Sequence, residues 1–142
     1  RGVATDLGWL SGALPADELG PLQAAAVDNA TAAAFFAIQA RNLARASPEG
    51  ITIAMGTDGN TPWGPHLEMA DMVATGMTPA EVLVAATKNA AEFLKLDDAG
   101  TVAPGKIGSF IVLEANPLDD IANTRRIREV YLRGDKVDRT SY

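Results

Sequence analysis

A short, mainly apolar run, Ile51–Met55, ends abruptly at Gly56. Its length and the glycine that bounds it predict a β-strand. Because no charged residue interrupts the run, the strand suits a position buried on both faces, as in parallel sheets. Helices cover the two faces of such sheets, so this feature predicts an α/β fold.

Helical sequence precedes this run. The Ala-rich stretch 21–46 predicts one long amphipathic helix, which Ser47, Pro48 and Gly50 would end. The stretch 8–21 contains Gly, Pro and Ser and predicts an irregular connection. No separate N-terminal domain is expected from this pattern.

Two further helices are predicted after the run. The first extends from near Pro65 to Thr75, and the second covers 79–96. The second has a sharp start, because Thr78 and Glu81 form a capping box and Pro79 suits the first helical position. Its apolar stripe is Val82, Leu83, Ala86, Ala90, Phe93 and Leu94, and its solvent face is Glu81, Lys88, Glu92 and Lys95.

The last part of the chain alternates turns and short strands. Residues 103–106 predict a type II turn, and Phe110–Glu114 predicts a strand. Residues 129–133 and 136–139 predict a hairpin around Gly134-Asp135. Helix, strand, two helices and then small β elements are typical of the tail of an α/β domain with a β accessory unit.

The composition excludes several classes of binding partner and chemistry. The 142 residues carry a formal net charge of −6, which disfavours nucleic acid and anionic membranes as partners. With no cysteine, a disulfide framework and thiol chemistry are excluded. No apolar run is long enough to predict a membrane span. These features do not fix the cellular compartment, and among the compartments they favour the cytoplasm.

Asp58 is the leading candidate for chemistry. It lies in the loop Gly56–Asn60, directly after the predicted strand. Catalytic groups gather where the strands of parallel α/β folds end, since loops there are held by a rigid sheet. A carboxylate in this position can ligate a divalent metal and accept a proton from water. The alternative is a turn in which the aspartate bonds its own backbone.

His66 is the single histidine of the chain. By itself it fits a helix start or a surface position better than a metal ligand. His66 and Glu68 do not have the i, i+4 spacing of a helical metal site. With one histidine and no cysteine, the usual nitrogen and sulfur ligands of catalytic zinc are not present in this chain.

Three stretches together resemble the C-terminal portion of the amidohydrolase superfamily, nearest its imidazolonepropionase-like and prolidase-like branch. They are Ile51–Asp58 (ITIAMGTD), the segment 66–92 with HLE, MVATGMTPAEVL and AATKNAAE, and the segment 100–121 with GTVAPGK and ANPLDDI. Each stretch alone is weakly specific. Their order and spacing make the combination specific over about residues 50–139.

The resemblance implies a (β/α)8 TIM-type barrel with Ile51–Met55 as its last strand. Residues 1–99 would be the last part of this barrel, and residues 100–142 would be strands of a small accessory β-sandwich. Asp58 matches the aspartate that in this family binds metal and shuttles a proton, so it is the expected metal ligand and catalytic residue. His66 matches a histidine near the substrate mouth and is the expected substrate-binding residue.

The other metal ligands of the family have no counterpart here, and at most two strands of a barrel are present. We therefore expect a fragment of a longer metal-dependent hydrolase that cleaves an amide or peptide-like C–N bond. The cofactor would be one or two divalent ions, zinc by expectation, and this chain alone would be inactive. Expected partners are a small-molecule or dipeptide-like substrate, the N-terminal part of the same protein and further copies in a homo-oligomer. The alternative is a non-catalytic barrel remnant that serves as an interaction or assembly module.

Overall fold

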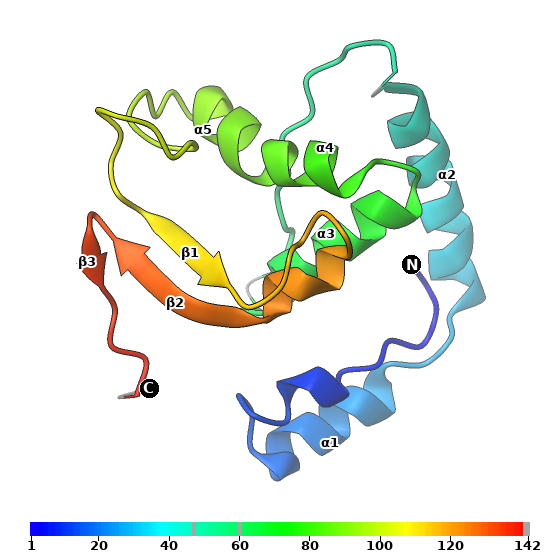
Figure 1. Ribbon diagram of the computed structural model, residues 1–142. Coiled ribbons are helices and arrows are strands. Elements are labelled where there is room, and N and C mark those ends of the chain that lie inside the picture. The colour runs from blue at the N-terminus through cyan, green and yellow to red at the C-terminus, as the bar shows by residue number, and fades with distance from the viewer. Residues whose placement is uncertain (47, 60, 141–142) are drawn as a thin grey trace. The chain divides into compact units, whose positions relative to one another are not determined.

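The computed structural model describes residues 1–46, 48–59 and 61–140 (Figure 1). The chain forms two compact units, 1–42 and 43–142. The predicted helix stop at Ser47 and the loop residue Asn60 lie outside the described residues.

The first unit contains a 3-10 turn, η1 (Gly8–Leu10), the helix α1 (Ala16–Ala25) and most of α2 (Ala30–Ala46). The prediction of one helix over 21–46 is wrong, because the chain leaves the helix between α1 and α2. Asn29 explains the break, since its Oδ1 accepts the Ala32 N–H at 3.0 Å and so caps a new helix. The irregular stretch predicted before residue 21 is also partly helical.

The second unit contains the predicted helices. α3 is Gly64–Ala74 and α4 is Pro79–Val84, and α4 continues through a π-helical turn, η2 (Ala85–Asn89), into α5 (Ala90–Phe93). The capping box of Thr78 and Glu81 is confirmed. The core of the unit consists of buried residues from these helices and the following segment: Met69, Met72, Met77, Val82, Ala85 and Ile121.

The apolar stripe of the third predicted helix is only partly buried. The stripe ends early, because Phe93 and Leu94 are 77% and 63% exposed. The π turn explains the difference, since its wider i to i+5 bonding rotates the following residues around the helix axis. The buried position after the turn is Ala91 instead of Ala90. The predicted solvent face is confirmed, because all four of its residues are exposed.

The prediction that Ile51–Met55 is a strand buried on both faces is wrong for the described chain. The segment has no strand partner among the described residues, and a strand needs a neighbour for its ladder. Ile53 and Met55 pack against the helical core, whereas Ile51 is 56% exposed. The segment is therefore covered by helices on one side only.

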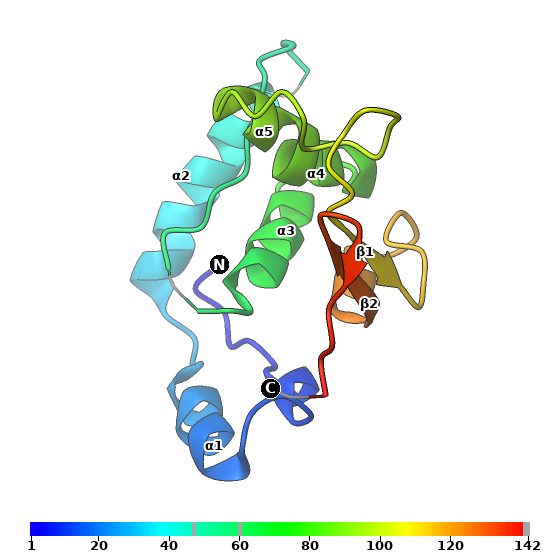
Figure 2. The same cartoon turned by 90° about the vertical axis from the view of Figure 1, so that its left-hand side faces the viewer.

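A small antiparallel sheet follows the helices. Its strands are β1 (Phe110–Leu113), β2 (Ile127–Leu132) and β3 (Asp135–Lys136), in the order β1-β2-β3. Phe110 pairs with Tyr131, and their rings stack with centroids 4.7 Å apart. The strands form a separate layer beside α3 and α4 (Figure 2).

The predicted turns of this part are present. The type II turn is confirmed, because the Lys106 N–H donates to the Ala103 carbonyl at 3.2 Å and Gly105 has a φ of +82°. The hairpin turn lies one residue earlier than predicted, at Arg133-Gly134. Both residues have a positive φ, as a type I′ turn requires. Among the described helices, none is long and apolar enough to cross a membrane.

Candidate functional site

Asp58 lies in the exposed loop that leaves the Ile51–Met55 segment. No described residue hydrogen-bonds to its carboxylate, so the carboxylate can accept a proton or bind a cation. The loop around it is tied locally, because the Thr57 hydroxyl donates to the Gly59 carbonyl at 3.4 Å.

His66 lies in the first turn of α3, directly after Pro65. Its side chain is half-buried, and its Nδ1 lies 3.1 Å from the Oγ1 of Thr124, a buried residue of the 3-10 segment η3 (Ile121–Arg125). The Thr124 hydroxyl donates to the Ile121 carbonyl at 2.8 Å, so its single proton is already used. The Nδ1–H of His66 therefore donates to Thr124, which favours the tautomer with a lone pair on Nε2.

The surroundings of His66 favour its neutral form. Burial lowers the pKa of the imidazole below its ordinary value of 6.5, and the nearby charge of Arg125 lowers it further. Glu68, two residues along the same helix, has a pKa that is raised, first by burial and then by the negative charge of Asp71. The structure thus places a neutral imidazole and a weakly acidic carboxyl on α3.

A pH-dependent stability follows from the lowered pKa of His66. Below pH 6.5 the unfolded chain binds a proton that the folded chain resists, so the free energy of unfolding should fall as the pH drops through this value. Above pH 6.5 the imidazole should not make the free energy of unfolding depend on pH. Urea unfolding of the wild type and of His66→Gln at several pH values from about 5 to 8 measures this. Parallel pH curves for the two proteins would contradict the assignment.

Metal ligands are sparse in this chain. The described residues contain no group of three His, Cys, Asp or Glu side chains placed to hold a metal ion. Asp58 could supply one oxygen ligand, whereas a catalytic zinc site needs about three protein ligands. A metal site that includes Asp58 would therefore need further ligands from outside the described residues.

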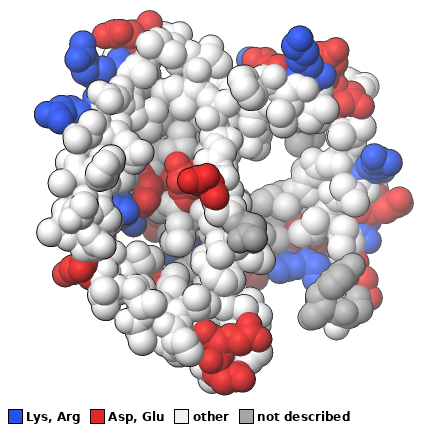
Figure 3. Space-filling view, turned by 180° about the vertical axis from the view of Figure 1, so that it is seen from behind, with Lys and Arg blue, Asp and Glu red and all other residues white. Residues whose placement is uncertain are grey.

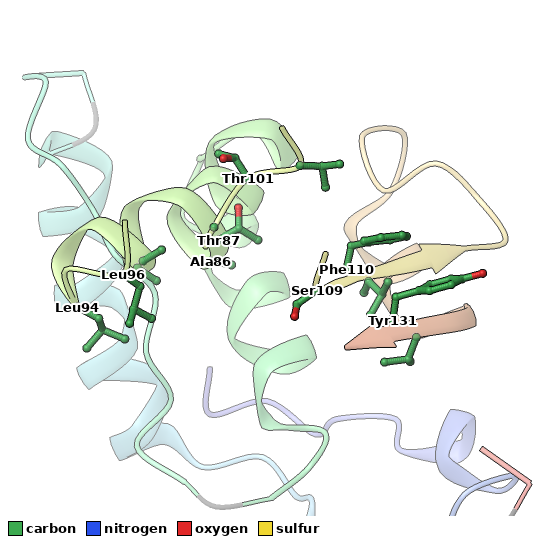
Figure 4. A pocket seen from close by; sticks show the side chains of 14 residues that line it. Ala86, Thr87, Leu94, Leu96, Thr101, Ser109, Phe110 and Tyr131 are labelled. Atoms are coloured by element: carbon green, nitrogen blue, oxygen red, sulfur yellow. The ribbon is translucent and has the colours of Figure 1, made fainter. Parts of the chain in front are cut away.

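A cavity of about 740 Å³ lies between the η2–α5 helical segment and the β1–β2 sheet (Figure 4). Its lining is mainly apolar, with the stacked rings of Phe110 and Tyr131 on one side and Leu94 and Leu96 on the other. None of its lining residues belongs to the Asp58 loop or to the first turn of α3. The cavity is thus separate from the predicted catalytic residues.

Charged side chains are spread in small groups over one face of the described residues. On the face shown in Figure 3, acidic and basic residues form small separate groups between wide uncharged areas. The ion pairs are on the surface, such as Lys88 with Glu92 at 3.8 Å on one helix face.

Asn89 and Thr124 are the residues that sequence reasoning missed. The Nδ2 of Asn89 donates to the Ile53 carbonyl at 2.8 Å, so it contacts the segment that leads to Asp58. Thr124 contacts His66 across 58 positions of sequence. Neither contact has a local sequence signal, because both join segments that are far apart in the chain.

Comparison with known proteins gives one family. Residues 7–137 match the amidohydrolase family. The chain is 35% identical over 96 residues to the imidazolonepropionase of Deinococcus deserti, a match that covers 62% of this chain and 24% of that protein. It is 38% identical over 74 residues to the adenine deaminase of Nitratidesulfovibrio vulgaris, covering 52% of this chain and 12% of that protein.

Solved structures agree with this result. Phenylurea hydrolase B superimposes with a TM-score of 0.64 and 31% identity, over 71% of this chain and 27% of that chain. A Xaa-Pro dipeptidase with bound methionine in its active site gives a TM-score of 0.64 and 27% identity, over 70% and 25%. The chain therefore spans about a quarter of the length of these proteins.

Proposed function

The chain belongs to the amidohydrolase family, and from this premise we propose that it is the C-terminal part of a longer metal-dependent hydrolase that cleaves an amide or peptide-like C–N bond. The observation that carries the proposal is the position of Asp58, exposed in the loop after Ile51–Met55 within the matched region. In the longer protein, Ile51–Met55 would gain strand neighbours and become the last strand of a TIM-type barrel.

Asp58 carries the chemistry in this proposal. Its carboxylate accepts a proton from the water that attacks the carbonyl carbon, and it later delivers that proton to the leaving nitrogen. A divalent metal, zinc by expectation, would lower the pKa of water and polarise the carbonyl when bound. Asp58 would supply one oxygen ligand, and the remaining ligands would come from the part of the protein beyond this chain.

His66 is proposed to bind substrate. Its neutral imidazole, oriented by Thr124, can accept a hydrogen bond through Nε2 from a polar group of the substrate. We expect His66→Ala in the longer protein to raise KM about tenfold while kcat changes little, because a lost binding contact costs about 1–1.5 kcal/mol. Steady-state kinetics measures both constants. An unchanged KM would show that His66 does not bind substrate and has only a structural role in α3.

The proposed function is tested by metal removal from the longer protein. Suitable substrates are an Xaa-Pro dipeptide, a phenylurea and an imidazolonepropionate, the classes that the names of its relatives suggest. We expect hydrolysis of at least one, loss of turnover with a chelator, and recovery when zinc or manganese is returned. Turnover that survives complete metal removal, or none on any substrate, would contradict the proposal.

Exposed apolar side chains in the second unit support the proposal that the rest of the protein covers part of its surface. Phe93, Leu94 and Val102 are 77%, 63% and 83% exposed. Covering such side chains stabilises a protein by roughly 25 cal/mol per Å². We propose that the remaining part of the protein, or a further copy in a homo-oligomer, covers this surface.

A second candidate function rests on the sparse ligand set. Because the described residues hold no three-ligand metal group, this chain taken alone fits a non-catalytic interaction or assembly module. Stoichiometric metal together with hydrolytic turnover in the purified 142-residue chain would exclude that candidate.

A further inference from the structure

We propose that Asn89 is a positioning residue, which holds the Ile51–Met55 segment against the π turn η2 and thereby sets the place of Asp58. The inference rests on the function proposed for Asp58. It adds a residue that contacts neither the substrate nor a metal ligand and acts through the backbone of the segment before the loop.

Two hydrogen bonds attach the segment to η2. The Asn89 Nδ2 donates to the Ile53 carbonyl at 2.8 Å, and the Met55 N–H donates to the Ala85 carbonyl at 3.0 Å. The two helix residues are four positions apart and the two segment residues are two positions apart. One turn of helix thus fixes two alternate residues of the segment, and both bonds end on its backbone.

The chemistry of the first bond requires a hydrogen-bond donor at position 89. A carbonyl oxygen only accepts hydrogen bonds, so the nitrogen of the side chain must face Ile53. Asparagine is a poor residue for a helix interior, because its side chain competes for backbone groups. The Ile53 carbonyl offsets that cost, since it gives the amide a partner outside the helix.

The second bond depends on the shape of the helix. A π turn replaces i to i+4 bonding with i to i+5 bonding, and such turns are often found at functional sites. Here the turn covers Ala85–Asn89, so it includes both residues that contact the segment. The carbonyl of Ala85 accepts from the segment instead of serving only the helix.

The attachment limits where Asp58 can lie. Asp58 follows Met55 by three residues, and three residues span at most about 10–11 Å when fully extended. Because the Met55 N–H is fixed to the helix, the Asp58 carboxylate stays within a short reach of that point. Without the Asn89 bond, the Met55 bond alone would attach the segment to η2, so the segment and the Asp58 carboxylate would be held less firmly.

The test compares two isosteric variants of the longer protein. Asn89→Asp removes the donor that faces Ile53 with little change in shape. Asn123→Asp is the matched control, because the Asn123 Nδ2 also donates to a backbone carbonyl, that of Asn116, at 2.9 Å, in a different segment. Amide hydrogen exchange of peptides covering residues 51–58 reports opening of the segment, and steady-state kinetics on the substrate found above reports catalysis.

We expect Asn89→Asp to speed exchange in residues 51–58 about tenfold and to lower kcat by at least about tenfold with little change in KM. Asn123→Asp should leave both readouts at wild-type values. Wild-type exchange in residues 51–58, an unchanged kcat, or an equal effect of Asn123→Asp would overturn the inference. An Asp58→Asn variant measured in parallel separates the two proposals: if it keeps full turnover, the function assigned to Asp58 fails, whatever Asn89→Asp does to the exchange.

Discussion

Asp58→Asn in the longer protein should lower kcat about 10³-fold or more while the fold remains nearly unchanged. The amide has the shape of the carboxylate, but it cannot take a proton from the attacking water, and general acid–base groups contribute about 10²–10⁴-fold to rates. The cost to folding should be small, because Asp58 is exposed and no described residue hydrogen-bonds to its carboxylate.

Kinetics and metal content should be measured together for this variant. Asp135→Asn is a suitable control, since it makes the same chemical change at an exposed residue of β3. The control should keep wild-type turnover. Wild-type activity with normal metal content in Asp58→Asn would show that Asp58 has no catalytic role.

Gly100→Ala is expected to produce a large loss of stability. Gly100 has a φ of +81°, and an added Cβ would lie 2.6 Å from the Ala91 Cβ and 3.0 Å from the Thr87 carbonyl oxygen. Positive φ costs an alanine about 1 kcal/mol, and overpacking adds roughly 1–3 kcal/mol. The free energy of unfolding should therefore fall by about 3 kcal/mol, a large part of the stability of a typical domain.

Gly105→Ala separates the cost of the positive φ from the cost of overpacking. Gly105 has a nearly equal φ of +82°, but no atom lies within 4 Å of the position of an added Cβ. Its substitution should cost only the backbone term, about 1 kcal/mol. Denaturant unfolding of both variants measures the difference. Equal losses would mean that the contact of Gly100 with the π turn and α5 does not affect stability.

Local signals predicted several elements of the second unit. Thr78 and Glu81 mark a helix start through a capping box that involves only neighbouring residues, and the structure contains it. The turn at residues 103–106 was likewise predictable, because Pro and Gly restrict the backbone by themselves. The break before α2 was missed, since Ala-rich sequence favours helix and concealed the cap that Asn29 provides.

Contacts between distant segments could not be predicted. The strand at Ile51–Met55 depends on neighbouring strands that the described residues do not contain, so its sequence alone predicted more structure than is present. Asp58 could be singled out because a carboxylate directly after a short apolar run is a candidate for metal binding and proton transfer. Thr124 and Asn89 have no such signal, since their roles depend on partners 58 and 36 positions away.

The most direct test of the central claim is the metal content and turnover of three proteins measured side by side: the longer protein, its Asp58→Asn variant and the 142-residue chain alone. If Asp58 serves an active site completed by residues beyond this chain, the longer protein holds about one or two metal ions per chain and hydrolyses its substrate. The variant then loses turnover, and the 142-residue chain has neither stoichiometric metal nor activity. Full turnover by the 142-residue chain, or by Asp58→Asn, would contradict the claim.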